Sequence, residues 1–204
     1  MNSHRYRKVK PSTIRARSRK KKLAIAGVLI AVILIVSVFF VLGQIPANQT
    51  PAMNTVLLRT SMGNITIALR DDMPKTTANF RNLVQRGVYD GTIFHRVMED
   101  FMIQGGDPTG TGFGDPSIPA IEDEFTNANH NDVGTVAMAN AGPNTGSSQF
   151  FINVVDNYGL DSKHPVFGSV IEGMSVVFAI SKVATDSSDR PQENVTIIKA
   201  ELLP

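Results

Sequence analysis

Residues 94–107 (FHRVMEDFMIQGGD) combine apolar positions with polar side chains that an ordinary core strand would lack. The apolar residues are sufficient to bury a strand–loop–strand unit. Arg96 and Gln104 stand among aromatic and Met residues, although an unpaired polar group away from water is costly. This combination is typical of an apolar pocket with a few placed hydrogen-bond donors. An edge strand whose Arg reaches solvent explains this stretch equally well, so both interpretations remain open here.

Two further stretches favour the pocket. Residues 137–152 (AMANAGPNTGSSQFFI) run from a small-residue strand through a turn-rich loop into an aromatic strand, and residues 160–168 (LDSKHPVFG) follow closely. In this order and at these separations, the three stretches resemble the cyclophilin family of peptidyl-prolyl cis-trans isomerases. The resemblance covers residues 55–204, and it rests on several long blocks instead of one short motif.

The resemblance implies catalysis of rotation about X–Pro peptide bonds. Resonance gives this bond a barrier of about 20 kcal/mol, and the uncatalysed isomers interconvert over roughly 10–100 s. A catalyst needs an apolar slot for the proline ring, anchors for the flanking backbone and a donor that favours a pyramidal prolyl nitrogen. It needs no nucleophile, metal or cofactor. The expected partners are therefore proline-containing segments of client proteins.

The resemblance also assigns roles to individual residues. Arg96 is expected to be the catalytic donor, and Gln104 to hold it in position and contact substrate backbone. The proline pocket is expected to consist of Phe101, Met102, Phe151 and Leu160, with His164 at its rim. The remaining expected substrate contacts are His95, Met98, Ala139, Asn140 and Gln149; Ala139 and Asn140 would pair with the substrate backbone. His95 is interpreted as a structural, hydrogen-bonded histidine, because the reaction moves no proton.

The chain departs from the family pattern at two places. Glu99 and Asp100 stand where many members have Pro-Gly, which adds charge near the groove but keeps Arg96 and Gln104 in register. Gly159 stands where many members carry Trp, and this chain has no Trp at all. That Trp is associated with tight cyclosporin binding, so binding of the drug is in doubt. Tyr158 is a candidate to fill part of the gap.

The N-terminal segment predicts a membrane anchor. Residues 1–22 hold ten of the twenty Lys and Arg and no acid, and residues 23–42 are uncharged. As a helix, residues 23–42 would span about 30 Å, the thickness of a bilayer core. The positive-inside rule then places the N-terminus in the cytoplasm and the remaining chain outside. An uncleaved signal-anchor is favoured because the apolar run is longer than the apolar region of a usual signal peptide. Secretion after cleavage is the alternative.

The net charge of the chain beyond the anchor argues against a nucleic-acid partner. Residues 43–204 hold ten basic and eighteen acidic residues, a net charge of −8, which disfavours nucleic-acid binding. The basic tail is expected to face anionic lipid headgroups. The chain has no Cys, so its stability must come from its core instead of disulfides. Sequons at Asn48, Asn64 and Asn194 are open to glycosylation where the machinery exists, and a monomer is expected.

The pattern beyond a linker at residues 43–54 predicts one all-β domain over residues 55–204. Residues 56–60 and 64–69 predict a hairpin, and residues 195–203 a last strand. Helices are predicted over residues 74–87 and 173–180. Many short strands with only two helices favour an all-β barrel. The resemblance implies a closed eight-stranded antiparallel barrel capped by two α-helices, preceded here by a single transmembrane helix.

Several other functions find less support. The glycine-rich residues 105–114 lack a phosphate-binding motif and predict a loop beside a groove. Residues 122–124 with His130 lack the spacing of a metal site and predict a solvated acidic turn. Ser147 and Ser148 lack the G-x-S-x-G turn of a serine hydrolase. A binding module that docks proline segments without turnover remains the main alternative, and a purely structural barrel explains none of the three blocks.

Overall fold

The computed structural model describes residues 54–204. The predicted basic tail 1–22, the predicted anchor 23–42 and all but the last residue of the linker 43–54 lie outside this range, as does Asn48. Among the described residues, no helix combines the length and apolar character that crossing a bilayer requires.

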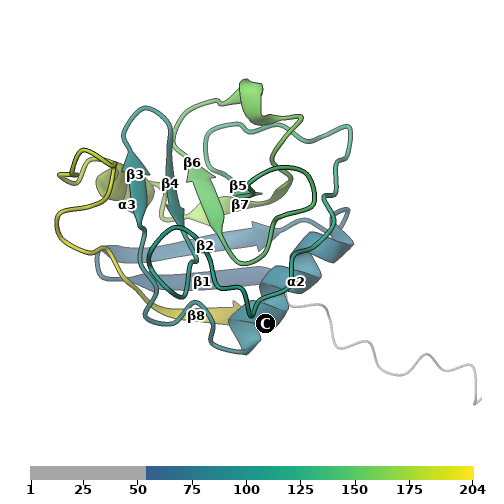
Figure 1. Cartoon of the computed structure of the whole chain (residues 1–204), viewed down its shortest axis with the longest axis horizontal. Helices are drawn as coiled ribbons and strands as arrows, with labels where there is room; N and C mark the ends of the chain where they lie inside the picture. Colours follow the sequence, from purple (N-terminus) through teal and green to yellow (C-terminus); the bar gives the residue numbers. More distant parts are fainter. Residues whose placement is uncertain (1–53) are drawn as a thin grey trace, which may run out of the picture. The chain divides into compact units, whose positions relative to one another are not determined.

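The described residues form one eight-stranded antiparallel sheet and two α-helices. The strands are β1 (Thr55–Thr60), β2 (Gly63–Leu69), β3 (Arg96–Met98), β4 (Met102–Gly105), β5 (Thr135–Met138), β6 (Phe150–Asn153), β7 (Val166–Glu172) and β8 (Ile197–Leu203). Their order in the sheet is β3-β4-β6-β5-β7-β2-β1-β8. Figure 1 shows β1, β2 and β8 side by side in one half of the curled sheet, with the other strands in the second half.

The closure of the sheet differs from the expected closed barrel. The edge strands β3 and β8 do not pair with each other, and the sheet stays a curled half-barrel. Ile93 forms an isolated bridge to Thr196, and the Phe94 N–H donates to Val195 O at 2.9 Å, so the segment before β3 meets the beginning of β8 and the residues before it. β3 itself is short, and its Val97 N–H donates to Asp189 O at 2.8 Å instead of to a strand.

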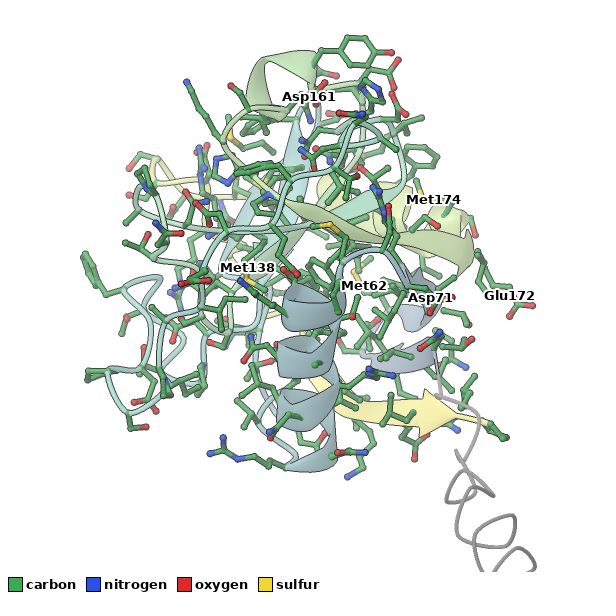
Figure 2. The ribbon with its side chains drawn as sticks, turned by 90° about the vertical axis from the view of Figure 1, so that its right-hand side faces the viewer. Met62, Asp71, Met138, Asp161, Glu172 and Met174 are labelled. Atoms are coloured by element: carbon green, nitrogen blue, oxygen red, sulfur yellow. The ribbon has the colours of Figure 1, made fainter. Side chains whose placement is uncertain are left out.

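The helices agree with the prediction to within two residues at each boundary. Helix α2 (Pro74–Gln85) begins with Pro in its first turn and is followed by Gly87 at φ +69°. Helix α3 (Met174–Ser181) follows Gly173 at φ +89°. α2 packs against β7 and β8, as Figure 2 shows from the side, and α3 packs against β2, β3 and β4. A short 3-10 helix, η1 (Tyr158–Leu160), was not predicted.

The acidic turn at residues 122–124 has a structural task that the sequence did not indicate. Glu124 accepts hydrogen bonds from the backbone N–H groups of Lys75 (3.0 Å) and Thr76 (2.7 Å). The side chain of Met73, the N-cap of α2, makes no such bond, so Glu124 satisfies the free amides from a distant loop. Within residues 54–204, no three His, Asp or Glu side chains are grouped as a metal site would require.

Two separate apolar clusters lie on the two faces of the sheet. The inner cluster contains the fully buried rings of Phe80, Tyr89, Phe94, Phe150 and Phe167. The outer cluster consists of Met102, Ala137, Phe151 and Val166. Successive side chains of a strand point to opposite faces, so Phe150 faces inward and its neighbour Phe151 faces outward. The same alternation separates Ile103 from Met102. Two consecutive apolar residues of one strand therefore pack into two different clusters.

Candidate active site

The outer cluster lies where the proline pocket is expected. Met102, Ala137, Phe151 and Val166 form its buried floor, and they come from four different strands. The side chains packed at its border are Met98, Phe101, Ala139 and Leu160. The structure thus brings together all four residues predicted to form the pocket. Ala137 and Val166 were not predicted as site residues, although they stand opposite or beside predicted ones in the sheet.

Strand register places the two main polar residues side by side. Arg96 on β3 pairs with Gln104 on β4, and Gln104 pairs in turn with Phe151 on β6. The guanidinium carbon of Arg96 lies 5.9 Å from the centre of the Phe101 ring. A guanidinium at this distance from an aromatic face is attracted by the ring quadrupole. Arg96 therefore stands at the edge of the outer cluster with its charged group beside an apolar wall.

The partner of Arg96 is not the one that was expected. Its Nε lies 3.5 Å from Asp189 Oδ2, and its Nη2 lies 3.2 Å from Met98 Sδ. Among the described residues, Gln104 makes no hydrogen bond to Arg96, because its amide donates to Gln149 Oε1 at 2.9 Å. Cross-strand pairing brings the two backbones together, but it does not determine where the long side chains point.

A turn at residues 186–190 presents Asp189 to Arg96. The Asp186 carboxylate accepts from the N–H groups of Ser188 (2.8 Å) and Arg190 (3.0 Å). Asp189 has a left-handed backbone conformation with φ +61°, which Asp tolerates better than most residues. Nothing in the sequence linked this turn to Arg96, because ninety-odd residues separate them along the chain.

Gln104 belongs to a chain of amides that ends in the glycine-rich loop. Its Nε2 donates to Gln149 Oε1, and Gln149 Nε2 donates to Gly112 O at 3.0 Å. Together with Gly112, Phe113 and Asn140, both glutamines line a hollow of about 170 Å³. The loop thus borders a groove, as the sequence predicts.

Two residues expected to pair with substrate backbone are partly engaged within the protein. The N–H of Ala139 donates to Gln149 O at 3.0 Å. The side-chain amide of Asn140 donates to Lys163 O at 2.7 Å. Both residues line the hollow beside Gln104. The backbone N–H of Ala139, however, already donates its hydrogen bond within the protein, to Gln149 O.

His164 closes the apolar pocket on one side. Its Nδ1 lies 3.1 Å from Met138 O, and since a carbonyl only accepts, Nδ1 carries the proton of the neutral ring. The ring meets Phe151 edge-on, with centroids 5.4 Å apart. Desolvation by burial lowers the pKa of His164 below its usual value, although the bond to Met138 opposes this. His164 is therefore neutral at pH 7.

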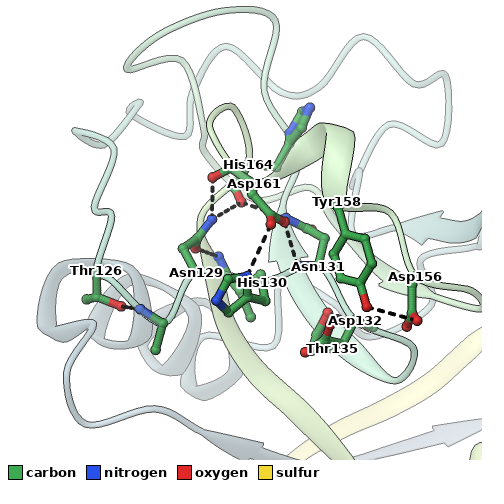
Figure 3. A network of polar contacts seen from close by, with 12 residues as sticks. Thr126, Asn129, His130, Asn131, Asp132, Thr135, Asp156, Tyr158, Asp161 and His164 are labelled. Carbon is green, nitrogen blue, oxygen red and sulfur yellow. Dashed lines mark hydrogen bonds and ion pairs between the residues drawn. The ribbon is translucent and has the colours of Figure 1, made fainter.

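A network of polar side chains fixes the segment that carries Leu160 and His164 (Figure 3). Asp161 Oδ1 accepts from the Asn131 N–H at 2.7 Å, and the Asn129 side chain donates to His164 O at 3.2 Å. Burial raises the pKa of Asp161, but the hydrogen bonds from Asn131 and His130 outweigh it and hold the pKa below its usual value. The charged carboxylate thus anchors a loop that has little regular structure of its own.

His95 is not among the residues that line the hollow beside Gln104, and its assignment as a substrate contact stays a prediction. It is buried beneath the glycine-rich loop, with Gly112 above its ring. The expected hydrogen bond is missing at Nδ1, which has no partner among the described residues. Desolvation lowers its pKa, and the nearby Asp107 only partly opposes this effect. Alternation along the strand explains the position, because Arg96 faces the groove and its neighbour His95 faces away.

The residues that depart from the family pattern lie at the edges of the site. Glu99 forms an exposed ion pair with Lys182 at 3.7 Å, and both border a hollow of about 380 Å³ with Met98 and Asp189. The Tyr158 hydroxyl donates to Asp156 Oδ2 at 3.1 Å, and the residue is 60% exposed. Tyr158 is not among the side chains that pack on the outer cluster. It therefore does not fill the place of the missing Trp.

A larger cavity of about 590 Å³ lies elsewhere. It is bordered by Ser61, Met62 and residues 183–184 and 192–195, and it contains none of the predicted site residues. Its only charged lining residue is Glu193. No cationic donor lines it, so the groove around Arg96 is the better candidate for chemistry.

Comparisons with known proteins agree with this geometry. The family described as "Cyclophilin type peptidyl-prolyl cis-trans isomerase/CLD" matches residues 55–202. "Peptidyl-prolyl cis-trans isomerase ppi1" of Schizosaccharomyces pombe is 52% identical over 155 residues, which cover 74% of this chain and 100% of the relative. The human "Peptidyl-prolyl cis-trans isomerase-like 1" is 50% identical over 154 residues, which cover 71% of this chain and 90% of the relative.

Solved structures show the same relationship. A cyclophilin-type isomerase of Cryptosporidium parvum superposes with a TM-score of 0.70 at 32% identity, covering 74% of this chain and 98% of that one. The same protein was also solved in the presence of the dipeptide Ala-Pro, at 33% identity to this chain and the same TM-score. With a family match over most of its length, an outer-face pocket and an Arg at its edge, this chain belongs to the cyclophilin-type peptidyl-prolyl cis-trans isomerases.

Proposed function

We propose that this isomerase binds X–Pro segments across the outer cluster and uses Arg96 as the donor to the prolyl nitrogen. The observation that carries this assignment is the position of the Arg96 guanidinium, beside Phe101 at the border of the pocket. An apolar slot and a cationic donor thus lie next to each other. The Ala-Pro dipeptide used with the Cryptosporidium relative supports a proline-containing peptide as the substrate class.

The proposed mechanism follows from how the X–Pro bond changes during rotation. At the twisted transition state the prolyl nitrogen loses its conjugation with the carbonyl and becomes a pyramidal acceptor. A donor aimed at that nitrogen binds the transition state more tightly than either planar isomer. Arg96 is suited to this task because a guanidinium never deprotonates and presents several donors in a fixed plane. Phe151 and Met102 hold the proline ring while the preceding carbonyl rotates.

The neighbouring polar groups have supporting roles in this proposal. Gln104, held by Gln149, borders the hollow beside the pocket and contacts the flanking peptide backbone. His164, neutral at pH 7, forms an edge of the pocket and transfers no proton. Leu160 and Phe101 complete the apolar border.

The experiment that tests the donor is the isomerisation of a short X–Pro peptide by the full-length chain and by Arg96→Ala. Removal of one such donor is expected to lower kcat by about 10²–10³. Arg59→Ala is the matched control, since Arg59 is an exposed, ion-paired arginine on β1. Equal rates for the wild type and Arg96→Ala would disprove the assignment of Arg96.

We further propose that residues 23–42 anchor the enzyme in a membrane and that the isomerase domain acts on extracytoplasmic clients. The support is the uncharged length of residues 23–42 after a basic segment. In that compartment, the exposed Asn64 and Asn194 are accessible for glycosylation. Cleavage of the N-terminal segment and secretion is the second possibility.

The absence of Cys allows a direct test of this topology. Single substitutions Ser18→Cys in the basic tail and Ser187→Cys in the domain would be labelled on intact cells with an impermeant maleimide. Labelling of Ser187→Cys alone, at the mass of the full chain, is the expected result. Labelling of neither position, with both labelled after lysis, would disprove an extracytoplasmic domain. A labelled protein shortened by the N-terminal segment would support the secreted form.

Weak cyclosporin binding is also proposed, because Tyr158 is held by Asp156 away from the outer cluster and no Trp takes its place. Gly159→Trp should therefore lower the dissociation constant for cyclosporin. Tight binding by the unaltered chain would refute this expectation.

A further inference from the structure

Met98 lies two residues after Arg96 on β3, so both side chains project from the same face of this short strand. Met98 is half-buried at the border of the outer cluster, and it also borders the hollow of about 380 Å³ that Asp189 lines. A border residue of this kind needs only apolar surface, which Leu or Ile would also provide. The sulfur of Met98 adds one feature that a hydrocarbon side chain lacks, a weak hydrogen-bond acceptor.

This sulfur contacts the guanidinium of Arg96. Arg96 Nη2 donates to Met98 Sδ at 3.2 Å. The neighbouring nitrogen, Nε, lies 3.5 Å from Asp189 Oδ2 in the ion pair described above. Two side chains, one from the same strand and one from a distant turn, thus hold adjacent nitrogens of one guanidinium.

Nε and Nη2 form one edge of the planar guanidinium. Arg70 illustrates this edge, because its Nε and Nη2 donate to the two oxygens of Asp72 at 2.9 and 2.7 Å. In Arg96 the same edge is divided between the carboxylate of Asp189 and the thioether of Met98. Among the described residues, Arg96 Nη1 has no hydrogen-bond acceptor. The end of the guanidinium that carries Nη1 is therefore available to a ligand.

The difference between the two acceptors favours a strong donor. A carboxylate that binds both nitrogens, as at Arg70, compensates much of the guanidinium charge. A neutral thioether on Nη2 of Arg96 leaves that charge in place. The positive charge matters because the twisted prolyl nitrogen becomes an acceptor only in the transition state, where a charged donor stabilises it most.

We propose that Met98 is a positioning residue whose sulfur fixes the plane of the Arg96 guanidinium and directs Nη1 toward the prolyl nitrogen. This inference rests on the proposed role of Arg96 as the donor. Asp189 holds the edge at Nε, and Met98 holds it at Nη2. Two contacts on one edge determine the plane of the group, whereas one contact at Nε leaves it free to rotate.

The test compares Met98→Leu and Met98→Gln in the full-length chain, with kcat and KM measured separately for a short X–Pro peptide. Leu keeps the apolar border but has no acceptor, whereas Gln has a similar length and a carbonyl oxygen that accepts from Nη2. We expect Met98→Leu to lower kcat by about two- to tenfold at unchanged KM, the effect of losing one hydrogen bond in the transition state. Met98→Gln should retain most of the wild-type kcat.

Thermal stability separates this role from a packing role. The melting temperature should be lower in Met98→Gln than in Met98→Leu, because Gln buries less apolar surface at the border. If Met98 only packs, kcat should follow the same order as the melting temperature. If its sulfur orients Arg96, kcat should follow the opposite order. A kcat of Met98→Leu equal to or above that of Met98→Gln would therefore overturn the role of the sulfur.

Met62→Leu is the matched control, since Met62 is 40% exposed between β1 and β2 and borders the remote cavity of about 590 Å³. Its kcat should equal that of the wild type. Arg96→Ala separates this inference from the function on which it rests. Equal rates for Arg96→Ala and the wild type would reject Arg96 as the donor. A large loss in Arg96→Ala without the expected order of the two Met98 variants would reject only the role of Met98.

Discussion

Arg96 Nε lies 3.5 Å from Asp189 Oδ2, so the proposed donor is paired with a carboxylate from a turn far away in the sequence. Both side chains are about two-fifths exposed. Exposed ion pairs contribute little to stability. Their value here is orientation, because a guanidinium that is held at Nε presents its remaining N–H groups in a defined plane.

Asp189→Asn is expected to lower kcat by about two- to fivefold, the effect of losing one exposed ion pair. Asn tolerates the positive φ of this position, so the turn is preserved. KM and the melting temperature should hardly change, since Asp189 orients Arg96 and is not proposed to contact substrate. Glu99→Gln removes another ion-paired carboxylate from the same hollow and is the control. Similar losses of kcat in Asp189→Asn and Glu99→Gln would show that removing either negative charge from this hollow lowers the rate, whether or not it pairs with Arg96.

Glu124→Ala is expected to destabilise the domain by about 0.5–2 kcal/mol, the usual cost of losing a helix cap. The change leaves the N–H groups of Lys75 and Thr76 without their acceptor. Urea unfolding followed by circular dichroism measures the effect, and kcat/KM should be unaltered because Glu124 does not line the groove. Glu122→Ala, which removes only an exposed ion pair to Lys75, should have a smaller effect. The opposite order would contradict the capping role of Glu124.

Asp107→Asn is expected to lower the free energy of unfolding by about 1.5–3 kcal/mol at pH 7, because charged hydrogen bonds are lost from a buried site. Burial raises the pKa of Asp107, but the hydrogen bonds from Thr109, Gly114 and Gly112 outweigh it and lower the pKa below 3.8. A lowered carboxyl pKa gives stability above the unfolded value, and this stability is lost as the pH falls through the folded value.

The difference between wild type and Asp107→Asn should therefore be full at neutral pH and shrink below about pH 3.8. Unfolding in urea at several pH values measures it. Asp115→Asn, on the exposed part of the same loop, is the control. A difference that grew in acid would show that Asp107 does not act as a charged acceptor.

The value of kcat/KM is expected to be independent of pH from about pH 7.5 to 8.5. Desolvation lowers the pKa of His164 below 6.5, so its ring stays neutral across this range. The rate should fall only at lower pH, as His164 gains a proton and its charge enters the apolar pocket. His164→Gln should remove that acid limb, measured with the same X–Pro peptide. A bell-shaped profile centred near pH 7 would point to proton transfer, which this mechanism excludes.

Much of the site follows from local sequence patterns. The alternation of apolar residues determined which strands form, and it placed Met102 and Phe151 in one cluster and Ile103 and Phe150 in another. Three blocks in a recognisable order indicate the family from the sequence alone. The helices were predictable because Pro begins α2 and glycines with positive φ lie at the helix boundaries.

The contacts of long polar side chains were not predictable in the same way. Gln104 was expected to hold Arg96, but its amide bonds to Gln149, and the hydrogen bond expected for His95 is missing at Nδ1. Because β3 has only three residues, its free edge bonds to Asp189 and not to β8. The sheet is therefore curled and does not close into the predicted barrel. Each of these outcomes depends on which distant segment arrives beside a strand.

The sequence alone determined the type of residue at each position, the strand alternation and the pattern of the family, since these depend on neighbours along the chain. The tertiary structure decided that Asp189 faces Arg96, that Glu124 caps α2 and that Phe113 stands beside Gln104. Asp189 and Glu124 reach partners that lie tens of residues away along the chain, whereas Phe113 and Gln104 are nine residues apart. Their energies arise only after the sheet has curled, because polar contacts and apolar burial require the final distances between side chains.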